Sequence, residues 1–233
     1  MKWLAIELIC LFSCLAQTRL QSNGTVSGSL TGEDGSNIVG GRVALLLLTA
    51  PYPARIAQQT LWTTTTGAGG SFRFGGLNSG TYKICAETAN SAWLNPCEWG
   101  LRPPQVALSA AQPTASVKVV MSKGAVVPIR IDDPAHLLSQ QEGKTAGAHL
   151  LVGVGTDALF FRTAPIVSSD ASGRYHQIVV PFAAYAKLVV RSSFFKLSDA
   201  GGSPLSPVAV IPVTVPAGQA PTAIRVVVTG SGR

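Results

Sequence analysis

The chain has 233 residues, of which only 12% are charged, and it contains 24 glycines and 15 prolines. This composition is typical of many short strands joined by turns, and it argues against a helical protein. The formal net charge is +7, but the basic residues stand singly between apolar ones. Because they form no basic run with interleaved aromatic residues, we expect no nucleic-acid partner. The length allows one large or two ordinary domains.

Residues 1–16 are typical of a signal peptide, with Lys2 ahead of an apolar run that reaches Phe12. The sequence allows two ways of processing this signal peptide. Cleavage after Ala16 would release a soluble exported protein. Alternatively, residues 11–14 (Leu-Phe-Ser-Cys) resemble a bacterial lipoprotein box, which would make Cys14 a lipidation site and give the protein a lipid anchor. The run is shorter than the roughly 20 apolar residues of a membrane-spanning helix. We therefore expect a secreted, periplasmic or outer-surface protein without a transmembrane span.

The segment from Thr63 to Cys85 predicts three short strands. Residues 63–66 are four threonines, whose β-branched side chains suit a pleated surface. Residues 67–70 (Gly-Ala-Gly-Gly) predict a tight hairpin turn, because glycine accepts positive φ. Phe72 and Phe74 alternate with polar residues, so both rings should lie on one face of a strand. Tyr82 and Ile84 repeat this alternation.

At these positions the sequence resembles a known family. The order T-x-T, then G-x-F-x-F-x-x-L-x-x-G-x-Y-x-I, is similar to that of the carboxypeptidase regulatory-like domain of bacteria, here carried by Thr65, Gly70, Phe72, Phe74, Leu77, Gly80, Tyr82 and Ile84. The resemblance covers residues 24–121 and implies a transthyretin-like (prealbumin-like) β-sandwich of about seven strands. It implies no catalytic residue, because the domain only accompanies a peptidase in the proteins that name it.

Once the signal peptide is removed, Cys85 and Cys97 are the remaining cysteines. An even pair in an exported chain predicts a disulfide. It would close a loop of about a dozen residues, which stabilises the fold by on the order of 3 kcal/mol in the chain-entropy model. A metal site needs more cysteine or histidine ligands than these two, so we expect no metal here.

The second half, residues 124–231, predicts a second β-sandwich with a turn or two of helix within residues 135–147. The expected strands are residues 126–131, 149–154, 159–163, 174–181, 186–191, 208–215 and 223–229. Residues 170–175 align with residues 67–72, and Tyr185 lies as far from Tyr175 as Tyr82 lies from Phe72. This echo suggests that the second domain is a degenerate repeat of the first. The predicted fold class is thus all-β, with two β-sandwich domains in tandem.

The sequence contains no motif of a known catalytic centre. His136, His149 and His176 lack a carboxylate at ligand spacing, so we expect lone surface or strand-end histidines. The acidic pairs at residues 33–34 and 132–133 are best explained by turn chemistry rather than calcium binding. Glu87 and Glu98 could form the carboxylate pair of a glycosidase, but we expect two ordinary surface acids. We therefore expect neither an enzyme nor a cofactor.

Trp62, Trp93 and Trp99 are the candidate ligand-stacking residues, since an indole face packs on sugar rings and fills interface pockets. The sequence as a whole predicts a non-catalytic, extracytoplasmic interaction or structural module. Its partner would be an unidentified protein or glycan. The alternative prediction is a carbohydrate-binding module that acts at the cell surface.

Overall fold

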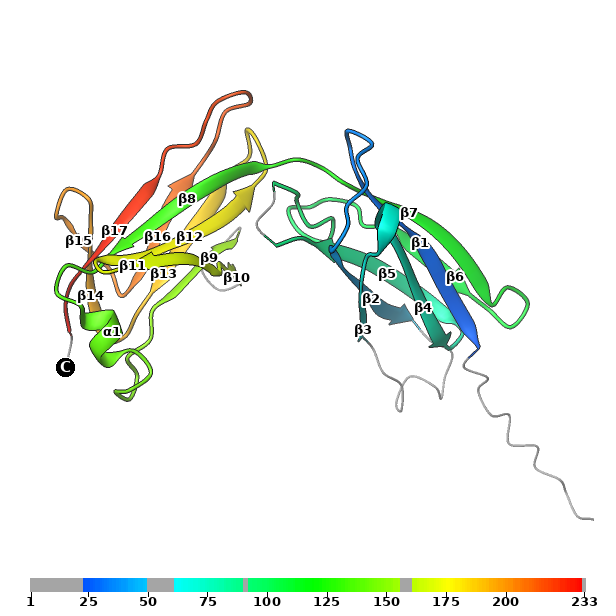
Figure 1. Cartoon of the computed structure of the whole chain (residues 1–233), viewed down its shortest axis with the longest axis horizontal. Coiled ribbons are helices and arrows are strands. Elements are labelled where there is room, and N and C mark those ends of the chain that lie inside the picture. The colour runs from blue at the N-terminus through cyan, green and yellow to red at the C-terminus, as the bar shows by residue number, and fades with distance from the viewer. Residues whose placement is uncertain (1–22, 50–60, 90–91, 156–160, 232–233) are drawn as a thin grey trace, which may run out of the picture.

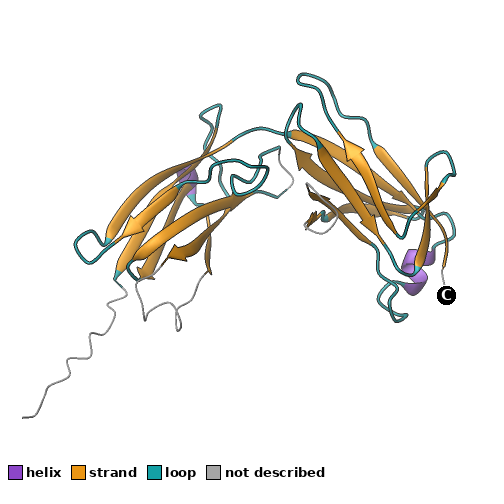
Figure 2. Ribbon diagram, turned by 180° about the vertical axis from the view of Figure 1, so that it is seen from behind, coloured by secondary structure: helices purple, strands orange, loops and turns teal. Residues whose placement is uncertain are grey.

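A computed structural model of the chain describes residues 23–49, 61–89, 92–155 and 161–231. The predicted signal peptide and the candidate lipidation site Cys14 lie outside these ranges. Within them, no helix has both the length and the apolar character that a bilayer crossing requires. The described residues form two β-sandwiches, which Figures 1 and 2 show as separate bodies joined by the segment between β7 and β8.

The first sandwich packs a three-stranded sheet, ordered β4-β1-β7, against a four-stranded sheet, ordered β3-β2-β5-β6. The strands are β1 (Gly24–Gly32), β2 (Arg42–Thr49), β3 (Leu61–Thr65), β4 (Ser71–Leu77), β5 (Gly80–Glu87), β6 (Gln105–Leu108) and β7 (Thr114–Met121). The described part of this half therefore has seven strands, in line with the number of about seven that the resemblance implies.

Alternating apolar residues build the core of the first sandwich. Phe72 and Phe74 on β4 are buried with their rings 6.0 Å apart in an edge-to-face arrangement. Opposite them, Tyr82 and Ile84 on β5 are fully buried. The Tyr82 hydroxyl donates a hydrogen bond of 2.7 Å to the Asn78 carbonyl, so the polar tip of this buried ring is satisfied.

The glycine-rich segment at residues 67–70 is not a hairpin turn. It forms a 3₁₀ turn over Ala68–Gly70 and carries the chain from β3 in one sheet to β4 in the other. Gly70 has a φ of +71°, and a Cβ there would lie 2.3 Å from the Leu30 carbonyl oxygen of β1. The glycine is needed because the crossover passes against β1, a long-range contact that short-range turn patterns do not reveal.

The second sandwich packs a six-stranded sheet, ordered β11-β12-β8-β17-β14-β15, against a four-stranded sheet, ordered β10-β9-β13-β16. Its elements are β8 (Ala125–Asp132), α1 (Leu137–Gln141), β9 (Leu151–Gly155), β10 (Phe161–Thr163), β11 (Ile166–Asp170), β12 (Gly173–Val180), β13 (Ala186–Arg191), β14 (Phe195–Asp199), β15 (Pro204–Leu205), β16 (Val208–Val213) and β17 (Ile224–Ser231). The sequence did not predict three short strands, namely the edge strands β11 and β15 and the strand β14 next to β15.

The two sandwiches share one strand order. In the first, β1 pairs antiparallel with β4 and parallel with β7; in the second, β8 pairs antiparallel with β12 and parallel with β17. The other sheet reads β3-β2-β5-β6 in the first and β10-β9-β13-β16 in the second. β11 and the β14–β15 pair are additions at the two edges. The origin by duplication and the domain bounds at residues 24–121 and 124–231 stay predictions. The shared strand order is the pattern that a duplication would leave.

The residues that the sequence alignment pairs do not occupy equivalent positions in the two sandwiches, however. Phe72 lies in the first core, whereas Tyr175 points outward and is 40% exposed. Tyr185 precedes β13 and is 59% exposed, whereas Tyr82 is fully buried. The two halves therefore match in topology but not in the side-chain positions that suggested the repeat.

Candidate functional site: a disulfide-closed loop between the sandwiches

The two cysteines form the predicted disulfide. Cys85 on β5 is bonded to Cys97, with Cα atoms 5.3 Å apart and a sequence separation of 12. Asn95 braces the end of the loop, because its side-chain oxygen accepts a hydrogen bond of 2.9 Å from the Cys97 N–H. The Glu98 N–H donates to the Asn95 carbonyl at 3.0 Å. The disulfide thus fixes the residues that follow Cys97 as well as the loop itself.

The closed loop holds the linker between the two sandwiches. The Leu94 N–H donates to the Ser122 carbonyl at 2.9 Å, and the Gly124 N–H donates to the Ala92 carbonyl at 2.7 Å. Lys123 lies between these bonds, with its ammonium 5.3 Å from the centre of the Trp93 ring. These contacts pair the linker with the loop along two residues, so the linker is not a free hinge.

Lys123 also connects the linker to the β1–β2 turn. Its ammonium lies 2.9 Å from the Asp34 carboxylate, and its N–H donates to the Glu33 carboxylate at 3.0 Å. Hydrogen bonds from Ser36, with a further contribution from Lys123, hold the pKa of Asp34 well below its usual range. The acidic pair Glu33–Asp34 therefore orders the linker and a turn, in line with the turn role expected for it.

Beyond Cys97, the chain contacts the second sandwich. Trp99 packs against the hydrophobic core of that sandwich and adopts a φ of +59°, a conformation that bulky residues rarely take. Its neighbour Glu98 lies 3.8 Å from the guanidinium of Arg162 on β10. Burial raises the pKa of Glu98, and the nearby Arg162 only partly offsets that effect. We name residues 92–99 the clasp, because this segment contacts the first core, the linker and the second core.

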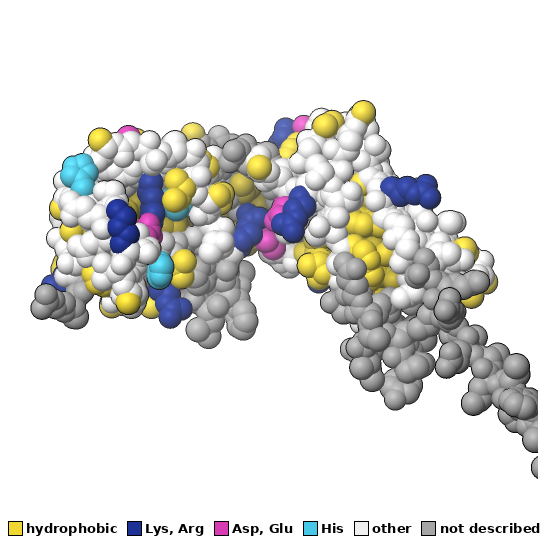
Figure 3. All heavy atoms as spheres, turned by 60° about the horizontal axis from the view of Figure 1, so that its bottom comes forward, with side chains coloured by type: hydrophobic (Ala, Val, Ile, Leu, Met, Phe, Trp, Pro, Cys, Tyr) yellow, Lys and Arg dark blue, Asp and Glu magenta, His cyan; other side chains and the backbone are white. Residues whose placement is uncertain are grey.

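A cleft of about 580 Å³ lies beside the clasp, between the two sandwiches. Arg42 and Glu87 line it from the first sandwich, and Arg162, Ile166 and Gln177 line it from the second. Figure 3 shows basic and acidic side chains next to one another where the sandwiches meet. Of the suggested glycosidase pair, Glu87 lines the cleft and is bonded to Arg42 at 3.0 Å, while Glu98 faces Arg162. Both carboxylates are thus occupied by ion pairs.

All three candidate stacking residues are partly buried and contact a core. Trp62 on β3 meets Tyr82 edge-to-face at 5.6 Å, and both Trp62 and Trp93 pack against the first core. Trp99 packs against the second. These packing contacts account for the indoles, and ligand stacking by them stays a prediction.

A buried polar cluster was not foreseen. His176 on β12 was expected to be a lone surface or strand-end histidine, but it is only 4% exposed. Its Nδ1 lies 2.9 Å from the Ala164 carbonyl oxygen. Two residues earlier, Arg174 donates to the Glu142 carboxylate at 2.6 and 3.3 Å. Burial would raise the pKa of Glu142, but hydrogen bonds from Arg174 and the Leu150 N–H outweigh it, so the pKa is lowered.

The cluster predicts a pH-dependent stability. Burial, together with the neighbouring Arg174, lowers the pKa of His176 despite the Ala164 and Pro165 carbonyls and the Glu142 carboxylate. The unfolded chain then binds a proton that the folded chain rejects, so the free energy of unfolding should fall as the pH drops below about 6.5. Denaturant unfolding at pH 5.5 and 7.5 measures this difference. In His176→Gln, the part due to this residue should vanish; an unchanged pH dependence would contradict the assignment.

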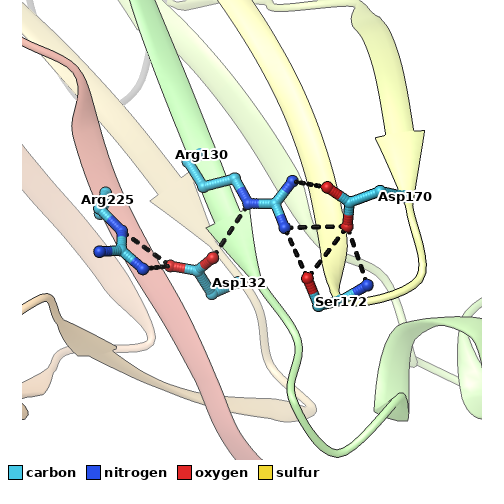
Figure 4. Close-up of polar contacts among 5 residues, drawn as sticks. All are labelled: Arg130, Asp132, Asp170, Ser172 and Arg225. Carbon is cyan, nitrogen blue, oxygen red and sulfur yellow. Dashed lines mark hydrogen bonds and ion pairs between the residues drawn. The ribbon is translucent and has the colours of Figure 1, made fainter.

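The side chains of the acidic pair at residues 132–133 form hydrogen bonds within the second sandwich. Asp132 accepts hydrogen bonds of 3.0 Å from Arg130 and 2.8 Å from Arg225 (Figure 4). Asp133 instead accepts hydrogen bonds from the Leu137 and Leu138 N–H groups at the start of α1. Among the described residues, no group of three or more histidine, cysteine or acidic side chains is placed to hold a metal ion.

The network around Arg130 extends to the β11–β12 turn. Its guanidinium donates to both Asp170 oxygens at 2.7 and 2.9 Å and to the Ser172 hydroxyl at 2.9 Å (Figure 4). Tyr175 stacks on the same guanidinium, 4.2 Å from the ring centre. These hydrogen bonds raise the pKa of Arg130 and lower that of Asp170. Every charged side chain in this network has a partner of opposite charge, so we infer that the network stabilises the sheet.

No family model matches the chain, and no curated protein is significantly similar to it. The resemblance to the carboxypeptidase regulatory-like domain therefore stays a prediction.

Solved structures that resemble the chain include a streptococcal ancillary pilin, with a TM-score of 0.42 and 11% identity, matched over 89% of this chain and 63% of the pilin. A minor pilin of Streptococcus agalactiae has a TM-score of 0.37 and 10% identity over 90% of this chain and 98% of the pilin. A putative carbohydrate-binding protein of Pseudomonas aeruginosa has a TM-score of 0.27 and 20% identity over 46% of this chain and 93% of that protein. The chain thus spans about three fifths of the ancillary pilin, and likenesses this distant carry no functional inference.

Proposed function

We propose that the protein is a non-catalytic, extracytoplasmic structural or interaction module, in which the clasp holds two β-sandwiches as one unit. The observation that carries this proposal is the placement of the clasp, which is closed by a disulfide on one sandwich and reaches the core of the other. Trp93 and Trp99, at its two ends, pack against different cores. A fixed arrangement of two domains suits a protein that presents a surface to a partner.

The disulfide supports the proposed location. Disulfides persist in oxidising compartments and are rare in a reducing cytosol. The identity of the partner is not part of this proposal.

The location is tested on the native protein. Cells of the natural host are treated with a membrane-impermeant alkylating or biotinylating reagent, fractionated, and the protein is analysed by mass spectrometry. We expect surface labelling or recovery outside the cytoplasm, with the peptides that contain Cys85 and Cys97 joined by a disulfide. Recovery from the cytosol with both thiols free would contradict the proposal.

A further inference from the structure

The outer face of the β4-β1-β7 sheet is polar apart from the exposed Val120 near one end of β7, and its charged side chains are both cations. The strand register places Arg73, Ser27 and Ser116 in one row across the sheet, and Ser71, Ser29 and Lys118 in the next. The buried side chains of these strands, such as Phe72 and Val26, point to the other face. The outer face of this sheet therefore presents four hydroxyl groups and two cations.

These six side chains line a shallow hollow of about 700 Å³. It exists because serine is small while the flanking arginine and lysine are long, and because Thr64 and Thr65 of β3 form a further part of its lining. Of the described residues that line the hollow, none is acidic. Arg73 and Lys118 are both exposed, and neither is among the ion pairs of the described residues, whereas Arg42, Lys123, Arg130, Arg162, Arg174 and Arg225 are.

The spacing of the two cations suits a ligand with several anionic groups. β4 and β7 lie on opposite sides of β1, and Arg73 and Lys118 are two residues out of register. At the standard strand spacing and rise, their Cα atoms are about 12 Å apart. A small anion could contact only one of these cations, whereas a polymer with repeated anionic groups could contact both.

We propose that this hollow binds an anionic polysaccharide, such as a uronic acid polymer, whose carboxylates pair with Arg73 and Lys118. Guanidinium and ammonium groups form charge-assisted hydrogen bonds to carboxylates. The Ser27, Ser29 and Ser116 hydroxyls, for which no hydrogen bond within the described part of the chain is found, can donate to and accept from sugar hydroxyls.

Other polyanions fit less well. Binding of single-stranded nucleic acid relies on aromatic side chains on which bases stack, and both aromatic rings of β4 are buried on the opposite face. An acidic protein partner would require an apolar centre to the interface, whereas the six outward side chains are serines, an arginine and a lysine. The choice of a polysaccharide rests on the proposed extracytoplasmic function, but the hollow itself does not.

The test measures binding of the purified mature chain to polygalacturonate by isothermal titration calorimetry at low salt. We expect the Arg73→Gln/Lys118→Gln variant to bind at least about ten times more weakly. The matched control is Arg191→Gln/Lys196→Gln, which removes two exposed cations from the second sandwich and should change the affinity less than twofold. Circular dichroism and thermal unfolding establish that both variants fold.

Three results would overturn the proposal: equal losses in the two double variants, equal binding of neutral dextran, or equal binding of a single-stranded DNA oligomer. Equal losses would show that the affinity depends only on the net charge of the protein. Equal binding of DNA would show that the surface binds any polyanion. The binding assay uses purified protein, so a lack of binding would not change the result of the location experiment. Conversely, a cytosolic location would not change an affinity measured in this assay.

Discussion

The Cys85→Ala/Cys97→Ala variant should unfold at a markedly lower temperature than the natural protein. The disulfide closes a loop with a sequence separation of 12 residues, and its loss should cost about 3 kcal/mol. For a sandwich of this size, that corresponds to a decrease in Tm of about 10 °C or more. Differential scanning calorimetry measures it, and the transition of the first sandwich, which contains Cys85, should move most.

Reduced natural protein is the control, since it loses the same bond without a substitution. Its transition should shift in the same direction and by a similar amount. A variant that unfolds like the oxidised natural protein would show that the other clasp contacts suffice and that the bond adds no stability.

The second large effect is expected for Arg174→Met. The side chains of Arg174 and Glu142 are 10% and 25% exposed, so removing the guanidinium leaves a carboxylate largely buried without its partner. Breaking a fully buried pair costs 3–5 kcal/mol. Because Glu142 keeps some contact with water and a hydrogen bond from the Leu150 N–H, we expect a loss of about 2–3 kcal/mol in a urea unfolding titration.

Arg42→Met is the matched control, because it removes an arginine from an ion pair on the surface. Arg42 and Glu87 are 60% and 41% exposed, and such pairs contribute less than about 1 kcal/mol. Adding Glu142→Gln to Arg174→Met should restore part of the lost stability, since the unpaired charge is then gone. Equal effects of the two arginine substitutions would contradict a buried pair.

The sequence predicts most of the fold because the apolar alternation is local. The period of two at Phe72 and Phe74 or at Tyr82 and Ile84 identifies a strand face without any knowledge of the rest of the chain. β11 was missed because all of its residues are exposed at a sheet edge, where no buried face imposes a pattern. The 3₁₀ turn before β4 was mistaken for a hairpin, because glycines permit both and only the contact of Gly70 with Leu30 distinguishes them.

The candidate site is less accessible to sequence reasoning. The disulfide follows from a count of cysteines, but the two cores that Trp93 and Trp99 contact belong to different sandwiches, and no local pattern reports this. His176 stands between Tyr175 and Gln177, so its neighbours give no sign of burial. On β12, Arg174, His176 and Ile178 share the buried face. This alternation is the local pattern from which the burial of His176 could be predicted, but it would place the charged Arg174 in a position that is normally apolar.

The distance between the two sandwiches, measured by pulsed electron paramagnetic resonance with one spin label on each, is the most direct test of the clasp. A narrow distance distribution is expected for the oxidised natural protein, and a broad one for Trp99→Ala, which removes the side chain that contacts the second core. Val39→Ala, a substitution at an exposed position outside the clasp, should keep the distribution narrow. A distribution that is already broad in the natural protein would contradict a two-sandwich unit held by residues 92–99.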